Sequence, residues 1–143
     1  MFKELIATGF GIGKLGYAPG TLGTLLGTPL AYLFGYKTYL LLVFIVLFYP
    51  IAYTSVQDML NRTREKDPEE VVVDEILGYL ACFTFVEPSL RSMVLAFVLF
   101  RIFDVLKPFP INLFERFPGA HGVIADDLAA GFLVSGLLFF LIQ

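Results

Sequence analysis

Acidic residues occupy positions where a strongly apolar chain tolerates them least. They fall in three groups, each at the edge of an apolar stretch: Asp74-Glu75, Asp104 and Asp126-Asp127. A carboxylate at the edge of a hydrocarbon layer is costly unless it is paired, hydrated or bound to a cation. Divalent cations take carboxylate oxygens as ligands, and the cations Arg101 and Lys107 flank the middle group. The pattern predicts a site for a divalent metal ion and a phosphate group.

The composition indicates that this site belongs to a membrane-embedded protein. Of 143 residues, 57% are hydrophobic and only 16% are charged, and the mean hydropathy is +0.79. Such a chain has too little polar surface to cover a soluble globule of its size. The length predicts a single domain over residues 1–143. A formal net charge of -3 without a basic stripe predicts no nucleic-acid partner.

The apolar stretches predict an all-α membrane bundle of about four to five helices, preceded by a short amphipathic helix within residues 1–10. Glu4 and the glycines that follow it interrupt the apolar run that a signal peptide needs, so we expect this segment to be retained. A tight turn over residues 35–37 should join the first two helices, and the second should kink or end at Pro50. The expected spans are 21–34, 40–48, 71–86, a helix stopped by Pro108, and 127–142.

The hydrophilic residues set the expected orientation. Residues 57–70 should form a loop in water. Because basic residues concentrate in cytoplasmic loops, the basic residues of this loop and those of the segment from Lys107 to Arg116 place both segments in the cytoplasm. Lys37 and residues 87–91 should then face the other side. This layout brings the acidic groups, Arg101 and Lys107 to one end of three helices. Gly78 and Gly131 lie just beyond the acids and should let another helix approach closely.

Each feature also has a simpler interpretation, which the sequence leaves open. The paired acids are favoured in a first helical turn by capping and the helix dipole, and Arg101 with Asp104 can be a structural ion pair. The run from Gly9 to Gly13 with Lys14 is either a loop ending in a cap at Thr21 or an anion cradle at a helix N-terminus. We expect the single cysteine, Cys82, to be an inert buried thiol, and His121 to be a loop residue.

Four segments of the chain resemble the bacterial phosphatidylglycerophosphatase A family. They are Gly-Ile-Gly-Lys-Leu-Gly-Tyr-Ala-Pro-Gly-Thr-Leu-Gly-Thr (11–24), Lys-Asp-Pro through Val-Val-Asp-Glu-Ile-Leu-Gly (66–78), Phe-Arg-Ile-Phe-Asp-Val-Leu-Lys-Pro-Phe-Pro-Ile (100–111) and Gly-Val-Ile-Ala-Asp-Asp-Leu-Ala-Ala-Gly (122–131). They occur in the family's order. The departures, Gly119-Ala120 for a Gly-Gly pair and Ile124 for Met, replace no charge.

The resemblance implies a Mg²⁺-dependent phosphatase of the bacterial inner membrane, multi-pass, with its site facing the cytoplasm. Its substrate would be the phospholipid phosphatidylglycerophosphate, which it converts to phosphatidylglycerol and phosphate. The expected roles are metal ligation by Asp74, Glu75, Asp104 and Asp127; catalysis by Asp104, Asp126 and Asp127; and substrate binding by Lys14, Thr21, Arg101 and Lys107. Water attack near the metal and an aspartyl-phosphate intermediate both stay open.

Other activities make different demands on the sequence. A cysteine phosphatase needs Arg six positions after its nucleophile. In this chain Pro88 occupies that position relative to Cys82. The alternative from another class is a small ion or proton transporter, which predicts acids distributed through the membrane depth. An assembly subunit without catalysis would leave the acidic cluster and the Gly-Lys loop unexplained.

Overall fold

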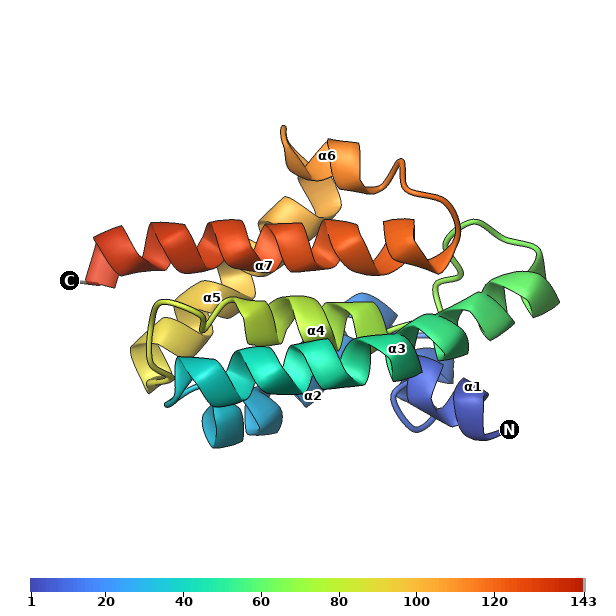
Figure 1. Ribbon diagram of the computed structural model, residues 1–143, viewed down its shortest axis with the longest axis horizontal. Coiled ribbons are helices and arrows are strands. Elements are labelled where there is room, and N and C mark those ends of the chain that lie inside the picture. Colours follow the sequence, from blue (N-terminus) through green and yellow to red (C-terminus); the bar gives the residue numbers. More distant parts are fainter. Residues whose placement is uncertain (143) are drawn as a thin grey trace.

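The computed structural model describes residues 1–142, which form seven α-helices and one short 3₁₀-helix, with no strand among them (Figure 1). In chain order these are α1 (Phe2–Ala7), η1 (Ile12–Lys14), α2 (Pro19–Phe34), α3 (Thr38–Thr63), α4 (Val73–Ala81), α5 (Leu90–Leu106), α6 (Ile111–Phe114) and α7 (Ala120–Ile142). The predicted all-α class, the N-terminal helix and the turn between the first two long helices are confirmed.

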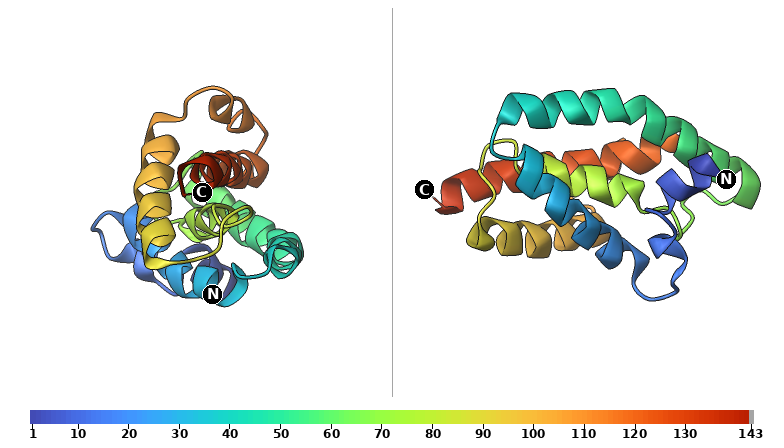
Figure 2. Two further views of the ribbon diagram at one scale, coloured as in Figure 1. Left: turned by 90° about the vertical axis from the view of Figure 1, so that its left-hand side faces the viewer. Right: turned by 90° about the horizontal axis from the view of Figure 1, so that it is seen from below.

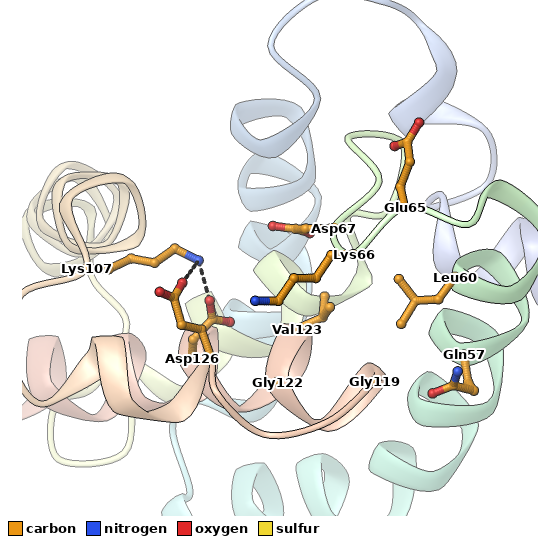
Figure 3. A pocket seen from close by; sticks show the side chains of 11 residues that line it. Gln57, Leu60, Glu65, Lys66, Asp67, Lys107, Gly119, Gly122, Val123 and Asp126 are labelled. Atoms are coloured by element: carbon orange, nitrogen blue, oxygen red, sulfur yellow. Dashed lines mark hydrogen bonds and ion pairs between the residues drawn. The ribbon is translucent and has the colours of Figure 1, made fainter.

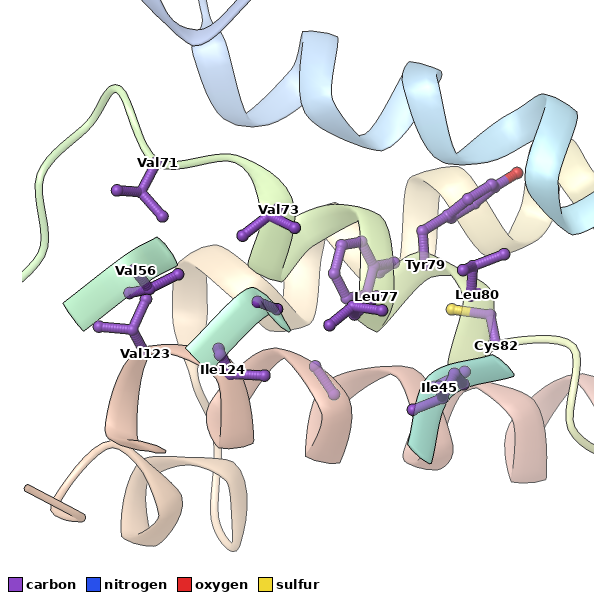
Figure 4. Close-up of a cluster of buried hydrophobic side chains, with 14 of the residues drawn as sticks. Ile45, Val56, Val71, Val73, Leu77, Tyr79, Leu80, Cys82, Val123 and Ile124 are labelled. Atoms are coloured by element: carbon purple, nitrogen blue, oxygen red, sulfur yellow. The ribbon is translucent and has the colours of Figure 1, made fainter. Parts of the chain in front are cut away.

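The short helix α4 lies at the centre of the bundle, between α2, α3, α5 and α7 (Figures 1 and 2). Most of its nine residues are buried, which is why it can be far shorter than a membrane span without exposing backbone to lipid. Figure 4 shows Leu77 and Leu80 of α4 packed among Ile45 of α3 and Ile124 of α7. Tertiary packing, rather than length, therefore stabilises this helix.

Three predicted helix boundaries are wrong. Pro50 does not end α3, which continues to Thr63, because a proline removes a single intrahelical hydrogen bond while Ala52, Val56 and Leu60 go on packing in the core. Residues 57–63, expected in a loop, form the polar end of this helix.

The other two boundaries are fixed by contacts between distant segments. Helix α4 ends at Ala81 instead of 86, and the amide of Phe85 donates to Ser135 Oγ at 2.8 Å instead of to a helical carbonyl. Helix α7 begins at Ala120 instead of 127, and the Ala120 amide donates to Gln57 Oε1 at 3.1 Å. A side chain from α3 thus satisfies one of the amides at the start of α7.

Two of the helices, α3 and α7, are long and apolar enough to cross a membrane. Large apolar side chains remain exposed along them, including Val46 and Leu47 on α3 and Phe140 on α7. These features are consistent with a membrane protein. The turns at 35–37 and 82–89 lie at one end of the bundle, whereas the α3–α4 and α6–α7 connections lie at the other (Figure 1).

Candidate active site

Three carboxylates meet where α4 crosses α7. Asp74 and Glu75 lie in the first turn of α4, and Asp127 lies in the second turn of α7; one carboxylate oxygen from each falls within 4.8 Å of the others. Asp74 is 4% exposed and Asp127 is 2% exposed. Glu75 is half-buried, and repulsion among these three carboxylates must be offset by cations or protons.

Glycines permit this close approach, as the sequence predicted. A Cβ atom on Gly78 would lie 2.7 Å from the carbonyl oxygen of Asp127, and one on Gly131 would collide with the carbonyl oxygen of Gly78. Any larger residue at either position would push α4 and α7 apart. The two glycines therefore set the separation of Asp74 from Asp127.

The carboxylate oxygens of this cluster fit a metal ion. Asp74 Oδ1, Glu75 Oε2 and Asp127 Oδ2 are buried and accept no hydrogen bond. An unpartnered buried oxygen costs free energy, and ligation of a cation removes that cost. A donor set of carboxylate oxygens without histidine or cysteine suits a hard divalent ion.

A second group of side chains lies at the C-terminal end of α5. Arg101 Nη1 donates to Asp104 Oδ2 at 2.5 Å, and the guanidinium rests against Gly20, where an added Cβ would lie 2.9 Å from Nη1. A cavity of about 300 Å³ lies here, lined by Arg101, Glu75 and the first turn of α2, including Thr21. The first-turn amides of a helix and an arginine fork both favour a bound anion.

A second polar cavity, of about 340 Å³, surrounds Lys107 and Asp126. Lys107 follows α5 as its C-cap and forms an ion pair with Asp126 on α7, and its Nζ lies 3.6 Å from Glu115 Oε2. Asp126 is 4% exposed, and its Oδ1 accepts no hydrogen bond. Figure 3 shows Lys66 and Lys107 extending into this cavity from opposite sides.

Lys14 lies away from these groups. Its ammonium pairs with Glu4, which also accepts a hydrogen bond from Arg62 at 3.1 Å. Lys14 does not line either of the two polar cavities. The structure therefore brings Thr21, Arg101 and Lys107 to the carboxylates but leaves Lys14 in a surface ion-pair network.

The single histidine is a helix residue, so its prediction as a loop residue is wrong. His121 lies in the first turn of α7, where its Nδ1 is 2.7 Å from the hydroxyl of Tyr49 and its ring packs on Tyr53. Its neighbours are aromatic side chains rather than carboxylates. Cys82 is fully buried, as expected.

Asp67 is a candidate site residue that the sequence analysis did not single out. It lines both polar cavities and so connects them. Although Asp67 retains contact with solvent, partial loss of hydration and repulsion by Asp74 raise the pKa of its carboxyl to about 6. The available signal was its place in the Lys66-Asp67-Pro68 motif; charge alone did not distinguish it from its acidic neighbours.

Comparison with known proteins identifies related sequences over nearly the whole chain. A family model described as Phosphatidylglycerophosphatase A matches residues 5–142. A Bacteroides thetaiotaomicron protein named "Putative phosphatidylinositol-3-phosphatase" is 37% identical over 139 residues, which cover 89% of this chain and 85% of that protein.

Two further relatives carry the family's name. "Phosphatidylglycerophosphatase A" of Escherichia coli is 31% identical over 145 residues, covering 96% of this chain and 82% of the relative. The Haemophilus influenzae protein of the same name is 36% identical over 147 residues, covering 98% and 88%. No solved structure matches the chain significantly.

Proposed function

The chain belongs to the phosphatidylglycerophosphatase A family and is a phosphatase, and we propose that it hydrolyses the terminal phosphomonoester of phosphatidylglycerophosphate. The reaction would be Mg²⁺-dependent and take place at the cytoplasmic face of the bacterial inner membrane. The observation that carries this proposal is the cluster of buried, unpartnered carboxylate oxygens on Asp74, Glu75 and Asp127, beside the guanidinium of Arg101.

In this proposal Asp74, Glu75 and Asp127 hold the ion. Asp104 lies outside this group of three but neighbours Asp127, and it would be a fourth ligand. Held by these carboxylates, Mg²⁺ would supply the positive charge that polarises a phosphoryl oxygen and lowers the pKa of water. Arg101 donates to the phosphoryl oxygens, and the first-turn amides of α2 with Thr21 face the same cavity. Lys107 supplies a second cation nearby.

The chain's own residues can also move the proton. Attack of water on phosphorus breaks the bond to the head-group oxygen, transfers the water proton to a carboxylate and leaves an alcohol after protonation of the departing oxygen. Asp126 suits the role of base because Lys107 orients it while its second oxygen remains free. Asp127 is the alternative, and direct attack by a carboxylate is the competing route.

The competing substrate is an inositol lipid phosphate, since the relative from Bacteroides thetaiotaomicron carries such a name. Both lipids place a phosphomonoester on a polyol that a phosphodiester joins to the diacylglycerol. Parallel assays with the two lipids distinguish them, and a higher kcat/KM for the inositol lipid would overturn the glycerol assignment. Asp74, Glu75 and Asp127 meet at one point, where α4 crosses α7, unlike the distribution through the membrane depth expected for a transporter.

Metal dependence gives the first test. Phosphate release from phosphatidylglycerophosphate in detergent should vanish after treatment with EDTA and return with added Mg²⁺, because the carboxylates need a cation to bring an anionic substrate close. Inorganic phosphate is measured before and after readdition. Full activity in thoroughly metal-stripped protein would contradict the mechanism.

Single-residue changes in the cluster give the second test. Asp74→Asn and Asp127→Asn should each lower turnover by a factor of ~10² or more, as expected for a lost ligand or base. The control is Glu69→Gln, which removes an exposed carboxylate that lines the Arg101 cavity. If both cluster variants fold and retain activity near wild type, the cluster has no part in catalysis.

A further inference from the structure

An apolar groove of about 480 Å³ begins beside the candidate site and leads away from it. One wall is α7, through Ala125, Leu128, Ala129, Phe132 and Leu133; the other is the α6 segment, through Pro110, Phe114 and Phe117. Helix α6 lies against the N-terminal half of α7 in Figure 1. The volume falls in the range of pockets that hold small ligands.

The groove lies beside Asp126 along α7. Ala125 immediately precedes Asp126, and Ala129 lies one turn beyond Asp126 on the same side of the helix. From Ala125 to Leu133 the groove follows α7 for about 12 Å, at 1.5 Å per residue. Because α7 is long enough to span a membrane, this direction leads from the site into one leaflet, which is about half of a ~30 Å core.

The end of α5 and the chain that leads from it to the α6 segment also expose large apolar side chains. Leu106 is 71% exposed and Phe109 is 77% exposed, and both flank Lys107 in the sequence. Apolar side chains this exposed beside a polar cavity indicate a face that contacts lipid. A lipid in the surrounding leaflet can therefore reach the groove without crossing water.

We propose that this groove holds one acyl chain of the lipid substrate, so that the head group is presented to Asp126 and the carboxylate cluster. This inference rests on the proposed function. Hydrocarbon gains little by moving from lipid tails to an equally apolar groove, so the groove's contribution is to orient the substrate. A misplaced reacting group slows catalysis strongly even when binding persists.

A larger apolar cavity fits this role less well. It measures about 630 Å³ and lies between α1, α2, α3 and α4. Its lining includes Val73, Ile76 and Leu77 of α4 but no residue of α5, α6 or α7. A chain held there would therefore not lie along α7, which carries Asp126 and Asp127.

The test fills the groove and compares two substrates. Ala129→Phe should lower the ratio of kcat/KM for long-chain phosphatidylglycerophosphate to kcat/KM for a soluble diacetyl analogue by at least about tenfold. Gly136→Phe is the matched control, since it adds the same ring to α7 beyond the groove, where an added Cβ meets no atom within 4 Å. If Ala129→Phe leaves this kcat/KM ratio unchanged, or if Gly136→Phe lowers it equally, the proposal that the groove holds an acyl chain is wrong.

An inactive wild-type protein and a misfolded variant are distinguished from a failure of the groove proposal. Wild-type protein that cleaves neither substrate would contradict the proposed function rather than the groove. If Ala129→Phe loses both activities through misfolding, wild-type protein is instead cross-linked to the lipid carrying a photoreactive diazirine in one acyl chain. Attachment to Leu128, Phe132 or Phe114 supports the groove, and attachment confined to the α1–α4 cavity overturns it.

Discussion

Arg101 joins two features that the sequence alone could not separate, an ion pair and an anion-binding group. Its guanidinium contacts Asp104 at 2.5 Å and also faces the first turn of α2 across a polar cavity. Nη1 donates to Asp104, and the other donors of the planar fork can bind an anion in that cavity, an arrangement that a lysine cannot reproduce. The side chain can therefore serve as a phosphate clamp while Asp104 holds its orientation.

Substitution of Arg101 distinguishes the clamp from a purely structural ion pair. Arg101→Lys should reduce kcat/KM by roughly tenfold or more while leaving Mg²⁺ affinity and thermal stability largely intact, because charge remains but bidentate geometry is lost. Steady-state phosphate release is measured for this variant, for Arg101→Gln and for the double variant Arg101→Gln/Asp104→Asn. Recovery of activity in the double variant would show that Arg101 only neutralises Asp104.

Asp67 should couple metal binding to pH. Its pKa of about 6 means that it gains charge as pH rises from 5 to 7, and the added negative charge beside Asp74 should attract a divalent cation. Mg²⁺ affinity, measured by calorimetry at pH 5.5 and 7.5, should rise more in wild type than in Asp67→Asn, by roughly threefold to tenfold. The other carboxylates are present in both proteins, so the comparison isolates Asp67.

Glu69→Gln is the control for that experiment, because it removes an exposed carboxylate from the same loop. An equal loss of pH dependence in both variants would assign the effect to the overall charge of the loop. An unchanged pH dependence in Asp67→Asn would remove Asp67 from the site.

At the scale of elements, the sequence predicted which residues meet better than it predicted where helices begin and end. Charge placement and small residues are local signals in a sequence. They were therefore enough to predict that the acids, Arg101 and the glycines Gly78 and Gly131 lie close together. The boundaries at 63, 81 and 120 depend on contacts between distant segments, such as Gln57 with Ala120 and Ser135 with Phe85. No pattern within one segment encodes those partners, nor does one encode the pairing of Lys14 with Glu4.

The crossing of α4 and α7 offers a test with a control on the same helix. Gly131→Ala should destabilise the protein by about 1–3 kcal/mol and reduce activity, because its Cβ collides with the Gly78 carbonyl and separates Asp74 from Asp127. Gly136→Ala should be neutral or slightly stabilising, since the added Cβ meets no atom within 4 Å. Thermal unfolding and phosphate release are compared; equal behaviour of the two variants would mean that the crossing tolerates a wider separation.

At the scale of the whole molecule, the polar and apolar ends of the bundle define how it can lie in a membrane. Helix α3 carries exposed Lys37 at its N-terminal end and exposed Arg64 at its C-terminal end, with 26 helical residues between them. That length is about 39 Å at 1.5 Å per residue, more than the ~30 Å hydrocarbon core. The two positions must therefore face opposite sides if α3 spans the bilayer.

The positive-inside rule then selects the orientation, and cysteine labelling tests it. Arg64 and Arg116 should face the cytoplasm, and Lys37 and Glu87 the other side, because the basic residues concentrate at the end with the candidate site. Single cysteines replace these four exposed residues in a Cys82→Ser background; the replacement should be tolerated because a serine hydroxyl can donate to the Gly78 carbonyl, as the Cys82 thiol does at 3.6 Å. In sealed inside-out vesicles an impermeant maleimide should label positions 64 and 116 but spare 37 and 87 until detergent is added. Labelling of 64 and 37 from the same side would mean that α3 does not cross the membrane, and the reverse pattern would place the carboxylates on the outer face.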